Sequence, residues 1–253
     1  MKKVQVSCGQ RKSLGVPASE RRATVADFSK VGFGPRSPKR RRFIMMRAIR
    51  FAADPRPAVM SLSIIHFPHP TLRHKSKPIV RVDQRLKDMA AEMLDLMYEY
   101  EGVGLAANQV DLPIRMFVAN ETGVRGEGKE WVVINPVIDR PKGNETSQEG
   151  CLSVPGLYAN VKRPKTVRMQ GYDLSGNEID EQLDGFLARV MQHELDHLDG
   201  VMFFDRLSDE SKRDLDDKLY EFDTNFESLR KTGSIPDDKT IQDRIAEWEK
   251  AYT

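Results

Sequence analysis

Cysteine is nearly absent from this sequence, because Cys8 and Cys151 are the only two among 253 residues. Two cysteines so far apart, in unrelated contexts, do not make the disulfide framework of a small secreted protein, and they fit a reducing compartment. No apolar run approaches the roughly 18 residues of a membrane span. Hydrophobic residues make up 39% and charged residues 31%. This balance is typical of a soluble globular protein that is long enough to bury a core.

Acidic residues are scarce at the N-terminal end, where residues 1–59 hold 3 Asp and Glu against 15 Lys and Arg, a net charge of +12. The remaining residues hold 35 against 25, a net charge of −10. Residues 1–59 show no helical or strand period and lack the apolar core of a secretory signal peptide, so we interpret them as a basic, largely disordered extension. Three roles compete: an organelle transit peptide, a nucleic-acid-binding arm, or a mis-assigned start codon. We favour the last, because Met60 immediately precedes the first ordered-looking segment.

After residue 60 the apolar residues become periodic. Helices are expected at 83–100, 185–198 and 208–229, and strands at 114–119, 131–134 and 166–171. Asp83 is the expected N-cap of the first helix, whose apolar face comprises Leu86, Met89, Met93, Met97 and Tyr100. The third helix carries one apolar stripe, formed by Leu215, Leu219, Phe222 and Phe226. Because the strands cluster ahead of the last helices, we predict an α+β fold rather than alternating βαβ units.

Histidine is also rare, and two of the five histidines fall in the segment His193-Glu194-Leu195-Asp196-His197. On a helix, positions i and i+4 lie on one face, so these two imidazoles can hold one metal ion. The glutamate between them can then reach a water on that ion. A catalytic metal usually has three protein ligands and one open position, and the candidate third ligand is Cys151. On its own, a lone cysteine is more often a core residue, because it packs like a small hydrophobic side chain.

A third segment, Gly102-Val103-Gly104-Leu105-Ala106-Ala107-Asn108-Gln109, could be taken for a phosphate-binding loop. It contains no Gly-Lys-Ser/Thr and follows a helix rather than a strand, so neither a P-loop nor a dinucleotide turn fits. Its glycines permit a backbone to approach a ligand closely. Gln109 adds a carboxamide donor.

Taken together, the segments GVGLAANQ, EGCLS and HELDH, in this order, resemble the three signature motifs of peptide deformylases, and IIHFPHPTLR resembles that family's N-terminal segment. The resemblance runs from about Ile64 to about Phe222. It implies small antiparallel or mixed strands packed around a central metal-binding helix, with a C-terminal helix. It also implies a catalytic domain at 60–232, between the extension 1–59 and a C-terminal extension at 233–253.

The resemblance also implies a role for each matching position. It makes Cys151, His193 and His197 the metal ligands, Glu194 the general acid and base, and Gln109 and the Leu152 N–H the oxyanion donors. The implied substrate-cleft residues are Val103, Gly104, Glu149, Gly150, Phe186 and Val190. Two positions differ from the best-known bacterial form: Tyr158 replaces an arginine near the cleft mouth, and Arg189 replaces an apolar pocket residue. Both differences leave open which side chains the enzyme prefers at the substrate position that follows the N-terminal methionine.

The implied reaction is hydrolysis of the formyl group on the N-terminal methionine of nascent polypeptides, with release of formate. One divalent ion is expected, Fe²⁺ with Zn²⁺ as the alternative, because the ligand set accepts either. The expected partners are formyl-methionyl nascent chains and the ribosome, not a membrane or DNA. The expected place is the cytoplasm, or a plastid or mitochondrion if residues 1–59 are a transit peptide.

Two other functions are consistent with part of the pattern. A zinc peptidase could use the same helix motif, but it would need a third His or Glu ligand further along, and no His follows His197. A ribosome- or RNA-binding protein could hold a structural metal, but such a site normally has four protein ligands and no acid beside an open position.

One further contact is expected beside the motifs. Glu149 and Asp196 each flank a metal ligand, and clustered buried acids need a compensating cation. Arg163 lies soon after the cysteine and can donate in a planar fork, so we expect it to bind one or both carboxylates.

Overall fold

A computed structural model describes residues 62–253, in which seven strands form two antiparallel sheets. The larger sheet has the order β1-β2-β3-β6-β7, and the smaller one is the hairpin β4–β5. The strands are β1 (Gly104–Ala106), β2 (Met116–Ala119), β3 (Trp131–Lys142), β4 (Glu145–Gly150), β5 (Tyr158–Arg163), β6 (Thr166–Tyr172) and β7 (Glu178–Asp184). The helices are α1 (Gln84–Glu99), α2 (Gly185–Leu198), α3 (Asp209–Arg213), α4 (Asp216–Lys231) and α5 (Asp238–Tyr252), with short 3₁₀ turns η1 (Pro70–Arg73), η2 (Ala107–Val110) and η3 (Phe203–Arg206). The predicted α+β class is confirmed.

The β1–β2 end of the larger sheet is buried on both faces. Successive side chains of a strand point to opposite faces. Leu105 and Val118 therefore pack in one hydrophobic cluster with α1, whereas Ala106 and Phe117 pack in a second cluster with α2. Burial on both faces explains why these two short strands are continuously apolar instead of alternating.

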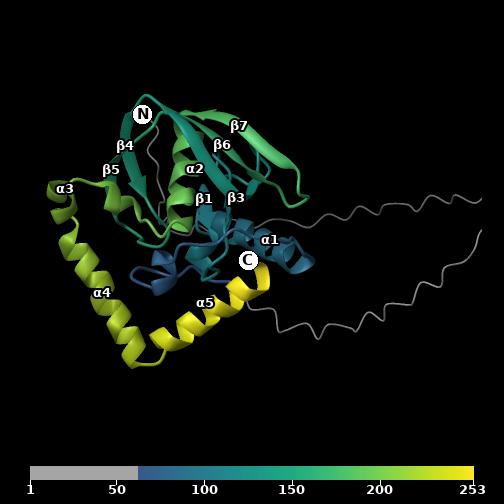
Figure 1. Ribbon diagram of the computed structural model, residues 1–253. Coiled ribbons are helices and arrows are strands. Elements are labelled where there is room, and N and C mark those ends of the chain that lie inside the picture. Colours follow the sequence, from purple (N-terminus) through teal and green to yellow (C-terminus); the bar gives the residue numbers. More distant parts are fainter. Residues whose placement is uncertain (1–61) are drawn as a thin grey trace, which may run out of the picture. The chain divides into compact units, whose positions relative to one another are not determined.

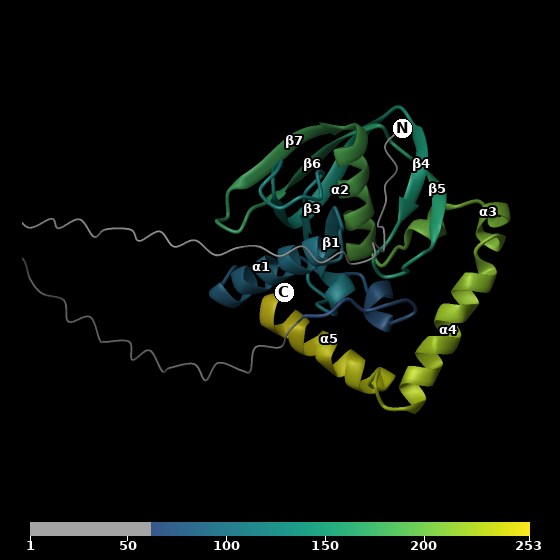
Figure 2. The same ribbon diagram turned by 180° about the vertical axis from the view of Figure 1, so that it is seen from behind.

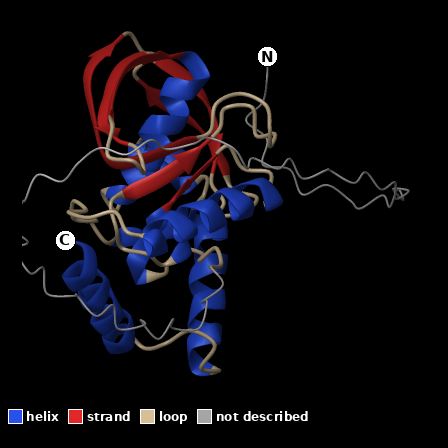
Figure 3. Ribbon diagram, turned by 90° about the vertical axis from the view of Figure 1, so that its right-hand side faces the viewer, coloured by secondary structure: helices blue, strands red, loops and turns tan. Residues whose placement is uncertain are grey.

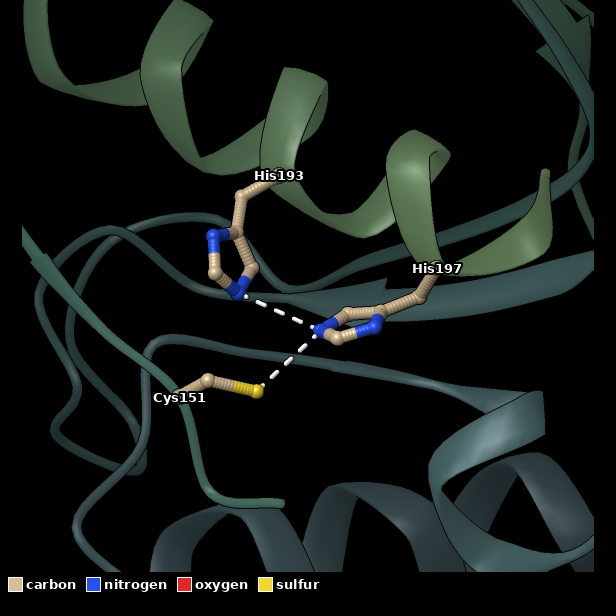
Figure 4. A group of neighbouring side chains, drawn as sticks. All are labelled: Cys151, His193 and His197. Atoms are coloured by element: carbon tan, nitrogen blue, oxygen red, sulfur yellow. Dashed lines mark hydrogen bonds between the residues drawn. The ribbon is translucent and has the colours of Figure 1, made fainter. Parts of the chain in front are cut away.

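Helix α2 lies between the hairpin and the larger sheet (Figures 1 and 2), and its bounds coincide with the predicted 185–198. Ala188, Met191 and Leu198 are fully buried in the cluster that includes the sheet. The sheet therefore fixes one side of the helix, and Figure 3 shows these helices in blue and strands in red. The other side of the helix carries His193 and His197 toward Cys151 at the end of the hairpin (Figure 4).

Helix α1 confirms its predicted cap, because the Asp83 carboxylate accepts a hydrogen bond from the Leu86 N–H at 2.9 Å. The apolar face is buried as expected, except at its last position. Tyr100 is 48% exposed, so its assignment to that face is wrong. The helix ends there, and the chain turns at Glu101, whose φ is +54°.

The third predicted helix, 208–229, is in fact two helices. Asp214 ends α3 and the chain turns at Leu215, which is buried against a cluster that contains Phe203 and Phe204. Leu215 stands between the two helices as the N-cap of α4, and it is the buried residue of this junction. Of the expected stripe, Leu215 and Phe226 are buried, while Leu219 and Phe222 are partly buried against the same cluster.

All three predicted strands differ in length from the observed ones, the 166–171 strand by a single residue. The predicted 114–119 strand begins only at Met116, because Ile114 forms an isolated bridge with Lys77. Strand β3 continues well past Ile134, and a register shift between Ile134 and Val137 accommodates Asn135, whose φ is +52°. A β-bulge of this kind accommodates the pair Asn135-Pro136, which would otherwise end the strand.

Helix α5 forms from residues for which no element was predicted, and it packs against the start of α1 (Figure 1). The Tyr252 hydroxyl donates to the Asp83 carboxylate at 3.1 Å, and the Arg85 guanidinium lies over the Trp248 ring. Buried Ile241 and Ile245 complete its inner face. No helix in the described part of the chain is long and apolar enough to cross a membrane. The interpretation of residues 1–59 concerns a segment outside the described residues.

Candidate active site

Three possible metal ligands converge between α2 and the end of the hairpin (Figure 4). The Cys151 sulfur lies 3.2 Å from Nε2 of His197, which lies 3.2 Å from Nε2 of His193. A tetrahedral ion with ordinary Zn–N and Zn–S bonds would place two such nitrogens about 3.3 Å apart and a nitrogen and a sulfur about 3.5 Å apart. The three atoms are therefore spaced as ligands of one ion. They form the one such group of His, Cys, Asp and Glu side chains found within residues 62–253.

The local structure explains this convergence. His193 and His197 are one turn apart on α2, so both imidazoles leave the same face. Cys151 follows directly after β4, at the point where Gly150 pairs with Tyr158 in the hairpin. A Cβ at Gly150 would lie 2.5 Å from the Tyr158 ring, so only glycine allows the tyrosine to cross the strand just before the cysteine.

Glu149 fixes the orientation of the first imidazole. Its carboxylate Oε2 lies 3.0 Å from Nδ1 of His193. Because Nδ1 is engaged there, the His193 Nε2 faces the other two ligands. Burial alone would raise the pKa of the Glu149 carboxyl, but the hydrogen bonds from His193 and Arg163 outweigh it and hold that pKa well below its usual range. Glu149 is therefore an anion in the folded protein.

The electrostatics of the ligand cluster favour a cation. Burial lowers the pKa of His197 well below its usual value, which keeps this imidazole neutral, the form that binds metals. At His193 burial acts in the same direction, but the hydrogen bonds with Cys151 and Glu149 outweigh it and raise the pKa well above its usual value. Cys151 and Glu149 thus stabilise positive charge on the His193 side of the cluster.

Arg163 joins the acids on either side of the cluster, as predicted. Its Nε and Nη2 donate to the two Glu149 oxygens at 2.6 and 2.9 Å, and its Nη1 donates to Asp196 at 2.7 Å. The Arg163 side chain is 2% exposed. Asp196 also accepts from Arg206 of η3 at 2.5 Å. Glu149 and Asp196 are therefore each compensated by at least one arginine, which is the condition for keeping such charges in a core.

Glu194 points into the same space from between the two histidines. Its Oε2 is buried and has no hydrogen-bond partner, although a buried polar atom normally has one. A Cβ at Gly104 would lie only 2.3 Å from Glu194 Oε1, so the glycine of β1 makes room for the carboxyl group. Burial is the main cause that raises the pKa of Glu194 to about 7. An acid of this kind can exchange a proton near neutral pH.

Gln109 approaches the cluster from η2. Its side-chain oxygen accepts from the Ala106 N–H at 2.8 Å, which fixes the amide plane. Its Nε2 then lies 3.3 Å from both the Cys151 sulfur and the Ser153 hydroxyl. The amide N–H groups are therefore presented to the space beside the cysteine.

These groups open onto one cleft. It is lined by Gly102, Val103, Gly104, Gln109, Glu149, Gly150, Cys151, Leu152, Phe186, Arg189, Val190, His193 and Glu194. Every predicted cleft residue is in this lining, whereas His197 is buried behind it at 1% exposure. The sequence analysis did not assign Gly102 to the cleft, and it had placed Arg189 only as the replacement of an apolar pocket residue. Gly102 could have been found, because it opens the glycine-containing motif.

Comparisons with known proteins agree with this geometry. A sequence model of the family described as "Polypeptide deformylase" matches residues 61–213. A peptide deformylase of Rhodopirellula baltica is 71% identical over 194 residues, covering 77% of this chain and 96% of that protein. The chloroplastic/mitochondrial peptide deformylase 1B of Arabidopsis thaliana is 40% identical, covering 72% of this chain and 66% of that protein.

Solved structures give the same result. The crystal structure of a plant peptide deformylase of type 1B superposes with a TM-score of 0.66 at 39% identity, covering 71% of this chain and 96% of that one. The peptide deformylase of Thermotoga maritima gives a TM-score of 0.55 at 40% identity, covering 58% of this chain and 97% of that one.

Proposed function

This chain belongs to the peptide deformylase family and removes the formyl group from nascent polypeptides, and we propose that it does so at the cluster of Cys151, His193 and His197. The observation that carries the proposal is the convergence of three ligand atoms beside an unpartnered, buried Glu194 oxygen. Neither the zinc peptidase nor the RNA-binding protein is supported by the comparisons.

The family and the cluster together imply one metal ion. A bound divalent ion supplies the Lewis acidity that makes water nucleophilic near neutral pH. We assign Fe²⁺ as the native ion, with Zn²⁺ as the alternative. One thiolate and two imidazoles suit both ions, and three protein ligands leave a position open for chemistry.

Glu194 is the general base and then the general acid. Its carboxylate takes a proton from the attacking water and passes it to the leaving amine of the methionine. Its unpartnered Oε2 supports this role, because the atom is buried yet free to bind a water or substrate proton. Gly104 supports it as well, because the absent Cβ leaves the carboxyl group in its place.

Gln109 and the backbone N–H of Leu152 stabilise the negative charge that develops on the formyl oxygen. Both residues line the cleft beside Cys151. The Gln109 amide donates to a sulfur, a weak acceptor, and to the Ser153 hydroxyl at 3.3 Å, which is long for an oxygen acceptor, so its N–H groups have a stronger interaction to gain from an oxyanion.

The cleft itself binds the formyl-methionyl end of the substrate. Phe186 and Val190 give an apolar wall for the methionine side chain, on the same helix as the metal ligands. Val103 and Gly104 on one side, and the backbone of Glu149 and Gly150 on the other, line the path of the peptide.

Around this catalytic domain, assigned to residues 60–232, we propose that the extension 1–59 is dispensable for the chemistry of small peptides. The extension 233–253 differs from it, because it carries α5, whose Ile241, Ile245 and Tyr252 are buried. The family match starts at residue 61, which supports the N-terminal bound. The relatives include the bacterial enzyme of Rhodopirellula baltica and the chloroplastic/mitochondrial enzyme of Arabidopsis thaliana. We propose the cytoplasm as the place of action, with a plastid or mitochondrion as the alternative, and association with the ribosome, which presents the nascent chain.

The test is formate release from a formyl-methionyl peptide by the purified chain, before and after chelation and after return of Fe²⁺ or Zn²⁺. We expect one free methionyl amine per formate, loss of turnover on chelation and its return with metal. Turnover that survives complete removal of the metal would contradict the proposal. Cleavage of internal bonds in an unformylated peptide would favour the peptidase instead.

A further inference from the structure

Arg189 is a buried cation on the metal-binding helix whose role the reaction above does not explain. Its side chain is 7% exposed. It lies four residues before His193, so the two side chains leave the same face of α2. A buried arginine is costly unless its donors are satisfied, and the contacts of Arg189 show which groups satisfy it.

Both terminal nitrogens of Arg189 bind the hairpin. Nη1 donates to Glu149 Oε1 at 2.7 Å and to the carbonyl of Val161 at 2.9 Å. Nη2 donates to the carbonyl of Glu145 at 2.8 Å. The side chain therefore reaches from α2 to both β4 and β5, and it also binds the carboxylate that orients His193.

This position matters because the metal ligands come from two separate elements. His193 and His197 are on α2, which the larger sheet holds by apolar packing. Cys151 follows the hairpin, which is not hydrogen-bonded to that sheet. Cys151 also packs in an apolar cluster that includes Val161 of the hairpin. The direct links between α2 and the hairpin are polar, and they include the contacts of Arg163 and Arg189 and the His193–Glu149 pair.

We propose that Arg189 is a positioning residue, which holds the hairpin against α2 and so sets the spacing of Cys151 from His193 and His197. The inference rests on the proposed metal site. The same contacts bear on which side chains the enzyme prefers after the methionine of the substrate, which the sequence left open. Because the guanidinium nitrogens are directed at the hairpin, the cleft is lined by the methylene stem of Arg189, and the residue does not select acidic side chains in the substrate.

The test compares Arg189→Met, which keeps a stem of similar length, with Arg189→Lys, which keeps one cationic donor. Glu149 retains Arg163 and His193 in both variants, so the buried carboxylate is not left without partners. The matched control is Arg168→Met, because Arg168 also donates to the carboxylate of a neighbouring element, that of Asp180 on β7, but lies outside the cleft lining.

Three kinds of measurement are made on each purified protein. The first gives the Co²⁺ affinity and the cobalt–thiolate absorption band, and the second gives the melting temperature without metal. The third gives kcat and KM for formyl-Met-Ala and formyl-Met-Glu peptides. Loss of a group that orients a metal ligand typically weakens metal binding by about 10- to 100-fold. We expect a loss of this size in Arg189→Met with an altered thiolate band, partial recovery in Arg189→Lys, and unchanged metal affinity in Arg168→Met. The preference between the two peptides should be unchanged.

Two results would overturn the inference. Wild-type Co²⁺ affinity in Arg189→Met would show that the hairpin keeps its place without the arginine, and a selective rise of KM for the Met-Glu peptide would make Arg189 a specificity residue. If Arg189→Met does not fold, the affinity of Arg189→Lys decides between the same outcomes. Failure of the wild-type chain to bind metal or release formate would instead contradict the proposed function.

Discussion

Gly104→Ala is expected to inactivate the enzyme through Glu194 alone. The added methyl carbon would lie 2.3 Å from Glu194 Oε1, 2.7 Å from Cδ and 2.9 Å from Cγ. Gly104 has no positive φ, so alanine fits the backbone, and the three shortest contacts of the added methyl carbon are all with the Glu194 side chain. Ordinary contact begins at 3.4 Å, so the oxygen must retreat by about 1 Å. A misplacement of this size can cost about 100-fold in rate.

We therefore expect kcat to fall by about 10²- to 10⁴-fold, which is the range spanned by general acid–base groups. The metal content should be unchanged, because the nearest atoms to the added methyl carbon belong to Glu194 and not to a ligand. The assay is formate release at matched metal occupancy. The double variant with Glu194→Ala supplies the control: if Gly104 acts only through Glu194, adding Gly104→Ala to Glu194→Ala changes kcat little. A Gly104→Ala enzyme with normal kcat and a raised KM would refute the reasoning, because it would place the methyl group in the path of the peptide instead.

Three further outcomes follow from the same geometry. Glu194→Ala should keep its metal and lose about 10²- to 10⁴-fold in kcat; near-normal turnover at equal metal content would remove Glu194 from the mechanism. The pKa of Glu149 lies below its ordinary value of 4.5, so as the pH falls below about 4.5 the unfolded chain binds a proton that the folded chain does not, and the free energy of unfolding should fall. Glu149→Gln should flatten this pH dependence of the unfolding free energy in chemical denaturation curves. An equal pH dependence in both proteins would contradict the prediction. A chain that starts at Met60 should fold and deformylate small formyl peptides as well as the full chain does, and an unfolded or inactive product would show that the catalytic domain begins earlier.

The sequence was most informative where one element carries both a regular period and a chemical motif. The bounds of α2 were predicted correctly, because its apolar residues and its two histidines follow the same helical spacing. The Arg163 bridge was predicted from charge alone, since two acids beside metal ligands require a cation.

The hairpin was missed because its strands lack the alternation that marks a half-buried strand. In β4 only Glu149 is fully buried, and Glu149 and Arg163 are buried by binding each other. Strand β7 is an acidic edge strand with Leu183 as its one buried residue, so its pattern is equally weak. The contacts of Arg189 could not be foreseen without this hairpin. Helix α5, by contrast, was readable: Ile241, Ile245, Trp248 and Tyr252 recur at helical spacing, and Asp237 is a capping residue.

The ligand set is tested most directly by X-ray absorption at the metal edge of the active, metal-loaded enzyme. The predicted first shell contains one sulfur at about 2.3 Å and two imidazole nitrogens at about 2.0–2.1 Å, with the remaining position filled from solvent. The sulfur contribution should disappear in Cys151→Ser and persist in Glu194→Ala. A spectrum without sulfur, or one with four protein ligands and no solvent position, would contradict a catalytic ion held by Cys151, His193 and His197.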